Sequence, residues 1–252
     1  MPVFFVSSEC ITPPTITITG ELRLHIKDSL RVAIGETLWF SDGQGTRYQA
    51  AISDISKRAV IGQILETIQE PSHVTPRLIL GQSLLKGEKM DWVIQKATEL
   101  GIHEIIPIES RHSVVQLKAD RLGHQLARWQ RIALEAAQQS EQRRIPTIAR
   151  PQSLATLLTS GKTPSTILLL AERRDGNSPQ TIALPQDQSS ALFVLIGPEG
   201  GWSKEELDLA EQRGIEPVTL GQQILRAETA AIATISILQS RLGRLGSLSP
   251  MA

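Results

Sequence analysis

A glycine-rich turn after an apolar run is the part of this sequence best suited to hold a ligand. Residues 191–196 (Ala-Leu-Phe-Val-Leu-Ile) have the composition of a buried strand. They stop at residues 197–201 (Gly-Pro-Glu-Gly-Gly), where three glycines without a Cβ let the backbone approach another molecule. Ser203 stands three residues before Glu206, which is the spacing of a capping box at a helix start. Strand, turn and capped helix are typical of a ligand-binding edge in an α/β fold, although the same pattern also forms plain connections.

A second glycine-ended segment lies about twenty residues further along the chain. Residues 218–221 (Val-Thr-Leu-Gly) predict a short strand, and a helix is expected from Ala227 to about Leu242. Arg226 stands between the two elements. Because parallel strands end at the same edge of a sheet, the two glycine segments are expected to lie side by side and form one pocket.

The first seventy residues predict a small β-barrel. Period-two alternation at residues 15–19 indicates a strand, and Asp42-Gly-Gln-Gly45 indicates a hairpin turn. Residues 69–76 carry two prolines and no periodicity, as expected of a linker. The remaining strands are expected at residues 38–40, 48–52 and 59–64.

From residue 77 the pattern changes to strands that alternate with helices. Such alternation predicts a parallel sheet covered by helices, so we expect a barrel domain at 1–70 and an α/β domain at 77–252. Helices are expected at 90–100, closed by Gly101, and along a long apolar face from Leu122 to Ala136. The strands are expected at residues 78–80, 104–108, 166–171, 192–196 and 218–220.

Composition favours a cytoplasmic globular protein. Of the 252 residues 40% are hydrophobic and 21% charged, and no apolar run reaches the roughly 20 residues that span a bilayer. The single Cys10 excludes an intrachain disulfide and a cysteine-based metal cage. The net charge is zero, but residues 71–151 carry 12 basic and 8 acidic residues, a net +4. Such a segment suits an RNA partner and also an ordinary solvated face.

Several common catalytic motifs are absent from the sequence. There is no G-x-G-x-x-G after a strand, no P-loop, no H-E-x-x-H and no G-x-S-x-G. The five histidines are scattered, so we expect no metal site. The glycine turn is therefore expected to serve another ligand.

Five motifs in order resemble one known family. They are Lys86-Gly-Glu-Lys-Met-Asp91, Gln95-Lys-Ala-Thr-Glu-Leu-Gly101, Glu135-Ala-Ala-Gln-Gln-Ser140, Gly197-Pro-Glu-Gly-Gly-Trp-Ser203 and Leu220-Gly-Gln-Gln-Ile-Leu-Arg-Ala-Glu-Thr-Ala230. Together they are similar to the small-subunit ribosomal RNA uridine-N3 methyltransferases of the RsmE type, in the SPOUT superfamily. The resemblance covers nearly the whole chain. Its β-rich start resembles the family's PUA-like RNA-binding domain.

The resemblance implies a parallel sheet with a deep C-terminal trefoil knot, which spacing alone would not suggest. It also implies a homodimer, S-adenosylmethionine in the knot loops, and N3-methyluridine in 16S rRNA of the small ribosomal subunit as product. By position, the cofactor-binding residues would be Leu170, Ala171, Glu172, Ile196, Gly197, Pro198, Gly200, Gly201, Leu220, Gly221, Ile224, Leu225, Arg226 and Ala230.

Three charged residues are expected to act on the substrate. Uridine N3 becomes nucleophilic once its proton leaves and the charge spreads onto O2 and O4. A fixed guanidinium would stabilise that charge, and Arg226 is the first candidate, with an ion pair to Glu228 as its alternative role. Glu228 and Glu199 are candidates to orient the base or to accept the proton.

Basic residues of the barrel and the middle third are expected to contact RNA phosphates, which position RNA without reading its sequence. A solvated face remains the alternative for them. The expected RNA-binding residues are Arg23, His25, Arg31, Lys86, Lys89, Arg111, Arg128, Arg131, Arg143 and Arg144.

Two departures from the family pattern keep other functions open. The family often has Phe where Trp202 stands and Arg where Gln223 stands. A related methyltransferase that acts on another RNA site is one alternative. A non-catalytic RNA-binding module is another, although the intact glycine turn and Arg226 disfavour it.

Overall fold

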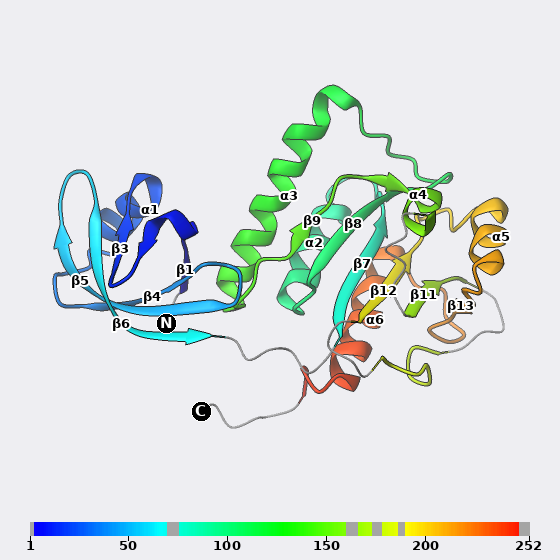
Figure 1. Cartoon of the computed structure of the whole chain (residues 1–252). Helices are drawn as coiled ribbons and strands as arrows, with labels where there is room; N and C mark the ends of the chain where they lie inside the picture. The colour runs from blue at the N-terminus through cyan, green and yellow to red at the C-terminus, as the bar shows by residue number, and fades with distance from the viewer. Residues whose placement is uncertain (1–2, 70–75, 160–165, 173–177, 186–189, 247–252) are drawn as a thin grey trace. The chain divides into compact units, whose positions relative to one another are not determined.

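The structure of the chain, a computed structural model, describes residues 3–69, 76–159, 166–172, 178–185 and 190–246 (Figure 1). By contacts between residues it divides into two units. The first unit contains residues 1–71 and 137–145, and the second contains residues 72–136 and 146–252. Most of the linker expected at 69–76 lies outside the described residues.

The first unit contains one curled six-stranded sheet. Strand β1 pairs with β4 in parallel, and all other neighbours are antiparallel. In spatial order the strands are β1 (Val3–Phe5), β4 (Thr37–Ser41), β5 (Thr46–Ile55), β6 (Val60–Gln69), β3 (Thr15–Ile18) and β2 (Ile11–Thr12). The sequence predicted β3 to β6 within a few residues, but it missed the short strands β1 and β2, which form the edges.

The inner face of this sheet packs on a helical segment that the sequence did not predict. Ile16 and Ile18 of β3 are almost completely buried, as their period-two spacing predicts. They share a core with Ile26, which is fully buried. Ile26 lies in η2 (His25–Ser29), one π-helical turn that continues α1 (Gly20–Leu24). These two pieces are each only five residues long, too short to show a helical period in the sequence.

The predicted hairpin turn after β4 is confirmed. The Asp42 carboxylate accepts hydrogen bonds from the backbone amides of Gln44 and Thr46, at 2.7 and 3.0 Å. Gly43 and Gly45 have φ of 70° and 114°, which glycine adopts without steric cost. Residues 143–145 lie along this turn, and the amide of Ile145 donates to the Gly43 carbonyl at 3.1 Å. The sequence pattern had placed this segment in the second domain.

The second unit contains the expected parallel sheet, and all of its pairings are parallel. The short strand β9 (Thr147–Ile148) pairs with β8 outside the main order. That order is β10 (Gln152–Ser153), β8 (Glu104–Glu109), β7 (Arg77–Ser83), β12 (Ala191–Ile196), β11 (Thr166–Leu170) and β13 (Pro217–Val218). The trefoil knot implied by the family resemblance stays a prediction.

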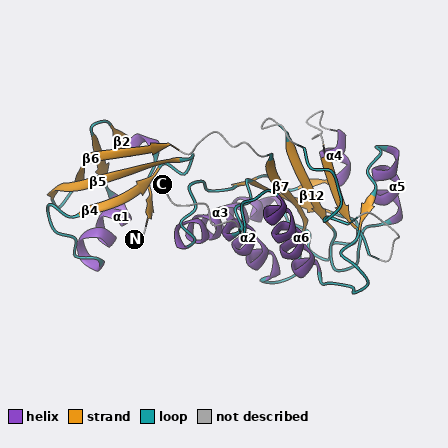
Figure 2. Cartoon of the chain, turned by 90° about the horizontal axis from the view of Figure 1, so that it is seen from below, coloured by secondary structure: helices purple, strands orange, loops and turns teal. Residues whose placement is uncertain are grey.

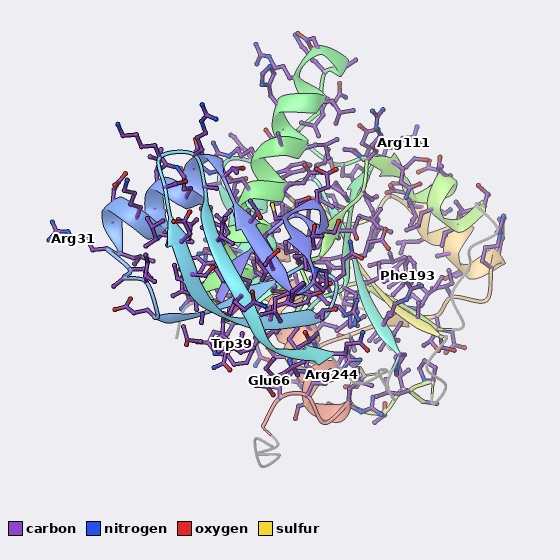
Figure 3. The ribbon with its side chains drawn as sticks, turned by 60° about the vertical axis from the view of Figure 1, so that its left-hand side comes forward. Arg31, Trp39, Glu66, Arg111, Phe193 and Arg244 are labelled. Carbon is purple, nitrogen blue, oxygen red and sulfur yellow. The ribbon has the colours of Figure 1, made fainter. Side chains whose placement is uncertain are left out.

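Helices cover both faces of this sheet (Figure 2). On one face α6 packs against α2 and against β12, and on the other face α4 packs against α5. Phe193 of β12 points into the core on the α4 and α5 side, and Figure 3 labels it within the sheet. The helices are α2 (Lys89–Glu99), α3 (Ala119–Gln139), α4 (Leu154–Thr159), α5 (Lys204–Gln212) and α6 (Ala227–Arg241). In the described part of the chain, no helix has the length and apolar character that crossing a membrane requires.

Two helix-end signals read from the sequence are confirmed. The Ser203 hydroxyl accepts a hydrogen bond from the Glu206 amide, and the Ser203 amide donates to the Glu206 carboxylate at 2.8 Å, which completes a capping box at α5. Gly101 follows α2 with φ of 75°. The strand expected at 218–220 is shorter, because a turn begins at Thr219, whose hydroxyl accepts from the Gly221 amide.

Candidate functional site

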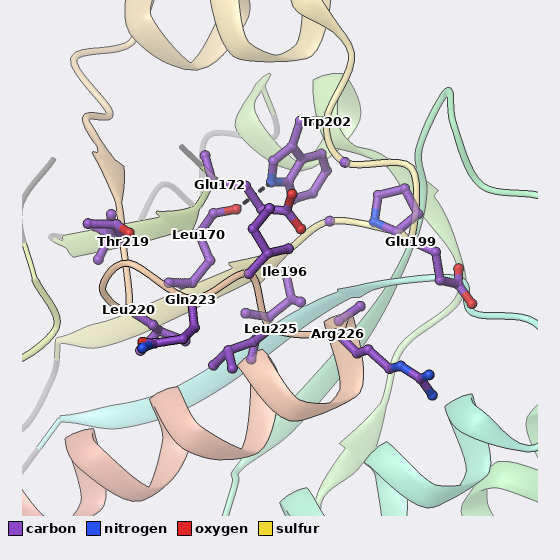
Figure 4. Close-up of a pocket in the computed structure, with 18 of the residues that line it drawn as sticks. Leu170, Glu172, Ile196, Glu199, Trp202, Thr219, Leu220, Gln223, Leu225 and Arg226 are labelled. Carbon is purple, nitrogen blue, oxygen red and sulfur yellow. Dashed lines mark hydrogen bonds between the residues drawn. The ribbon is translucent and has the colours of Figure 1, made fainter. Parts of the chain in front are cut away.

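A cavity of about 1050 Å³ opens at the carboxyl ends of three strands, β11, β12 and β13 (Figure 4). The segments that follow these strands form its wall. They are residues 170–172 at the end of β11, residues 196–199, 201 and 202 at the end of β12, and residues 218–227 before and at the start of α6. The two glycine segments singled out in the sequence therefore do meet in one pocket, at the edge where ligands bind in α/β sheets.

Trp202 fixes the glycine-rich turn to the neighbouring strand end. Its indole Nε1 donates a hydrogen bond to the Leu170 carbonyl at 2.9 Å, and its side chain is buried. A Cβ at Gly197 would lie 3.3 Å from the same indole ring, so glycine allows the backbone to pack directly against that ring. Gly201 closes the turn through a 2.9 Å hydrogen bond to the Pro198 carbonyl, with φ of 70°. The sequence treated Trp202 only as an aromatic exchange and missed this role, which phenylalanine could not perform.

The loop before α6 forms the opposite wall. The Ala171 amide donates to the Val218 carbonyl at 3.0 Å, which holds the ends of β11 and β13 together. Gly221 then turns the chain with φ of 120°. Leu220 and Leu225 point toward the cavity in Figure 4. The wall is thus mainly apolar, with backbone groups exposed where the glycines lie.

Nearly all residues that the sequence proposed for cofactor binding line this cavity. Gly200 does not, because a Cβ there would point at His112, 3.1 Å from its Cβ. The glycine therefore serves the packing of His112, whose ring Nδ1 lies 3.2 Å from the Gly201 carbonyl oxygen. Gln222 and Gln223, within the proposed cofactor loop 220–225, also line the cavity. The sequence did not propose the cavity residues Trp202, Leu207, Val218, Thr219 and Ala227 for cofactor binding.

Three charged side chains meet beside the cavity, and we call them the Lys89 cluster: Lys89, Glu199 and Glu228. The Lys89 ammonium lies 2.9 Å from Glu199 Oε1 and 3.9 Å from Glu228 Oε2. The Lys86 amide also donates to Glu199, at 3.4 Å. The two carboxylates named as catalytic candidates are therefore brought together by a lysine that the sequence assigned to RNA binding.

Glu199 is held ionised by its neighbours. Burial alone would raise the pKa of Glu199, but hydrogen bonds from Lys89 and from backbone amides, with the Lys89 charge, hold that pKa below its ordinary value. Because Glu199 Oε1 accepts hydrogen bonds from two donors, Glu199 connects the glycine turn to the start of α2. It is consequently the weaker of the two candidates for accepting a proton.

We expect the Glu199→Gln variant to lose stability less steeply in acid than the natural chain. Because the folded-state pKa of Glu199 is depressed, its contribution is complete above the ordinary carboxyl pKa of 4.5 and is lost as the pH falls through the folded value. Melting temperatures measured from pH 7 to pH 3 should therefore converge below about pH 4.5. Parallel curves would show that the Lys89 contact adds nothing to folding stability.

Arg226 lies at the edge of the cavity and is exposed. No described residue forms an ion pair or a side-chain hydrogen bond with it, so the alternative role beside Glu228 is not observed. It is the N-cap residue of α6 but makes no side-chain capping bond. Figure 4 shows its guanidinium on the same side of the cavity as Glu199. Its charge is free to meet a substrate.

The other predicted RNA-binding residues fall on both units. Arg31 projects away from the sheet of the first unit (Figure 3), with φ of 54°. Arg111 pairs with Glu205 at 3.2 Å. Arg128 Nε donates to Asp91 at 3.0 Å. Ion pairs with such exposed arginines contribute little to stability, so phosphates could replace the carboxylates. The first unit holds Arg23, His25, Arg31, Arg143 and Arg144, and the second holds Lys86, Lys89, Arg111, Arg128 and Arg131.

Comparison with known proteins identifies both parts of the chain. The RNA methyltransferase domain family matches residues 72–239, and the RNA methyltransferase PUA domain family matches residues 18–65. The ribosomal RNA small subunit methyltransferase E of Synechocystis sp. is 34% identical over 238 residues, which cover 92% of this chain and 76% of that protein. The Bacillus subtilis protein of the same name is 31% identical over 228 residues, which cover 88% and 89%.

Solved structures agree with this assignment. A ribosomal RNA small subunit methyltransferase E from Neisseria gonorrhoeae, bound to S-adenosyl methionine, matches with a TM-score of 0.82 and 30% identity over 96% of this chain and 98% of that one. A Legionella pneumophila methyltransferase in complex with the same cofactor matches with a TM-score of 0.82 and 28% identity over 95% and 97%. The chain therefore belongs to the ribosomal RNA small subunit methyltransferase E family.

Proposed function

We propose that this protein transfers a methyl group from S-adenosylmethionine to N3 of one uridine in the 16S rRNA of the small ribosomal subunit. The observation that carries the proposal is the cavity built from three strand ends, with Arg226 at its edge and unpaired by any residue that the structure describes. Family membership and two cofactor-bound relatives support the methyl donor. Uridine N3 as the acceptor comes from the motif resemblance.

The residues around the cavity fit S-adenosylmethionine in size and chemistry. A volume of about 1050 Å³ is ample for a nucleoside with an amino-acid arm. Ile196, Leu220 and Leu225 offer an apolar wall for an adenine ring. Gly197 and Gly221 expose backbone for hydrogen bonds to a polar ligand. These residues would hold the cofactor, and Glu172 supplies a carboxylate at the same wall for its ribose or ammonium groups.

When bound, the cofactor supplies an electrophilic methyl group: the N3 electron pair forms the new N–C bond, and the pair of the broken S–C bond stays on sulfur. The protein must align the uracil ring with that methyl group, because in-line displacement depends on orientation. Arg226 stabilises the negative charge on the uracil carbonyl oxygens as N3 loses its proton. The Glu228 carboxylate makes no hydrogen bond with any described residue, which leaves it able to accept that proton or to order a water that does.

We assign RNA binding to both parts of the chain. The barrel-like domain at 1–70, which contains the PUA match, would hold the RNA, and the domain at 77–252 would carry out the transfer. Phosphate contacts from the basic residues would position the RNA without reading its sequence. An unpaired or splayed uridine is the expected target, since its N3 edge must be free.

The protein is also expected to act as a homodimer with the site at the subunit interface, as the motif resemblance implies. Sedimentation at micromolar concentration should give a mass near twice 27.6 kDa. An active monomer would contradict this arrangement.

The test of the function is methyl transfer from labelled S-adenosylmethionine to small subunits that lack N3-methyluridine. Nuclease digestion and mass spectrometry should locate a single N3-methyluridine in 16S rRNA. Cofactor binding without transfer to this substrate would favour a related enzyme for another RNA site. Neither binding nor transfer would favour a non-catalytic RNA-binding module.

A further inference from the structure

Lys89 is held in place at the cavity wall by the two carboxylates of the Lys89 cluster. Its side chain is 35% exposed and lines the cavity, whereas the Glu199 and Glu228 side chains are 30% and 15% exposed. The side chain of a lysine normally has high rotational freedom, which two charged neighbours here restrict. The ammonium is therefore oriented before any substrate arrives.

The position of Lys89 is poorly suited to a purely structural role. It is the first residue of α2, where the helix macrodipole disfavours a cation. The Lys89 cluster also carries a net charge of −1, which repels phosphate. A phosphate, the ligand expected from the sequence, is thus less suitable for Lys89 than a neutral group with hydrogen-bond acceptors.

The Lys89 ammonium has unused hydrogen-bonding capacity. It has three N–H donors, and one is directed to Glu199 at 2.9 Å. The 3.9 Å separation from Glu228 exceeds a hydrogen bond, so that contact is electrostatic. No other described residue accepts from this ammonium. Two donors therefore remain for a ligand in the adjoining cavity.

We propose that Lys89 is a second catalytic residue, which donates a hydrogen bond to a carbonyl oxygen of the uracil ring beside N3. The inference rests on the proposed function. Loss of the N3 proton spreads negative charge over two carbonyl oxygens, and the cavity edge offers two cations, Arg226 and Lys89. Donors already oriented toward the place where charge develops stabilise it most effectively. Glu199 is the positioning residue that holds the ammonium by a hydrogen bond, and Glu228 adds an electrostatic contact to its proposed role as proton acceptor.

The experiment compares two RNA substrates, one with uridine and one with 5-fluorouridine, in reconstituted small subunits. The fluorinated base has a more acidic N3, so its negative charge needs less stabilisation by the protein. Lys89→Met should lower kcat on uridine RNA about 100-fold and on 5-fluorouridine RNA about tenfold or less. The Kd for S-adenosylmethionine should stay within about twofold, because Lys89 acts on the base.

Lys86→Met is the matched control. Lys86 belongs to the same segment as Lys89, but it contacts Glu199 only through its backbone amide. Any loss in this variant should be the same on both RNAs, as expected of a phosphate contact. Equal losses on both RNAs for Lys89→Met, or a large loss of cofactor affinity, would overturn the inference. If the methionine variant does not fold, Lys89→Gln, which keeps a donor for Glu199, undergoes the same comparison. A natural enzyme inactive on both RNAs would instead refute the proposed function.

Discussion

Replacing Arg226 with alanine is expected to lower kcat about 100- to 1000-fold, which corresponds to the loss of about 2.7–4 kcal/mol of transition-state stabilisation. The Kd for S-adenosylmethionine should change by less than about threefold, because the guanidinium stabilises charge that appears only during transfer. Folding should be little affected, since Arg226 is exposed and makes no capping bond at α6. Single-turnover rates and calorimetric cofactor binding would separate these effects.

Arg226→Lys is the companion variant. It keeps the positive charge but lacks the fixed, planar set of donors, so we expect it to recover only part of the lost turnover. Equal losses in turnover and cofactor affinity for Arg226→Ala would instead identify Arg226 as a cofactor contact. A normal rate for the alanine variant would remove it from the mechanism.

Replacing Gly221 with valine is expected to weaken S-adenosylmethionine binding by about 10- to 100-fold. The Gly221 backbone has φ of 120°, and a β-branched residue in such a conformation costs about 1–3 kcal/mol. No atom lies within 4 Å of a Cβ at this position, so the cost comes from the backbone and not from a clash. Relief of this strain requires the loop to change shape, which displaces the cavity residues Leu220 and Leu225. Equilibrium dialysis with labelled cofactor would measure the effect.

Gly214 provides a control of nearly the same kind. It has φ of 70°, has free space around its Cβ position and follows α5 away from the cavity lining. Gly214→Val should lower the melting temperature but leave the cofactor Kd unchanged. If both variants bind the cofactor normally, the loop before α6 does not form the binding site.

The sequence predicts the parts of the fold that depend on interactions between residues close together in the chain. The capping box at Ser203 and the glycine after α2 act through their own backbone neighbours, so residue type and spacing are sufficient. The same holds for the alternation in β3 and for the apolar face of α3, where Trp129 and Ala133 are buried. The pairing of the two glycine segments was also predictable, because parallel strands end together.

The features that the sequence did not predict depend on contacts between distant residues. The hydrogen bond from Trp202 to the Leu170 carbonyl joins segments 32 residues apart. The direction of Gly200 toward His112, and not toward the cavity, is set by the packing of a separate loop. The Lys89 cluster combines residues from three segments, so the sequence could not place Lys89, which it proposed for RNA binding, beside the cavity. Only tertiary structure can distinguish these roles.

The bond between Trp202 and Leu170 also constrains how this chain can diverge from its relatives. An exchange of Trp202 for phenylalanine would leave a buried carbonyl oxygen without its donor, at a cost of about 1–3 kcal/mol. The exchange should be tolerated only together with a compensating change near Leu170 that supplies a new donor or admits a water. Position 202 is therefore expected to show epistasis with the end of β11, so that transplanting a relative's residue alone would not reproduce the relative's site.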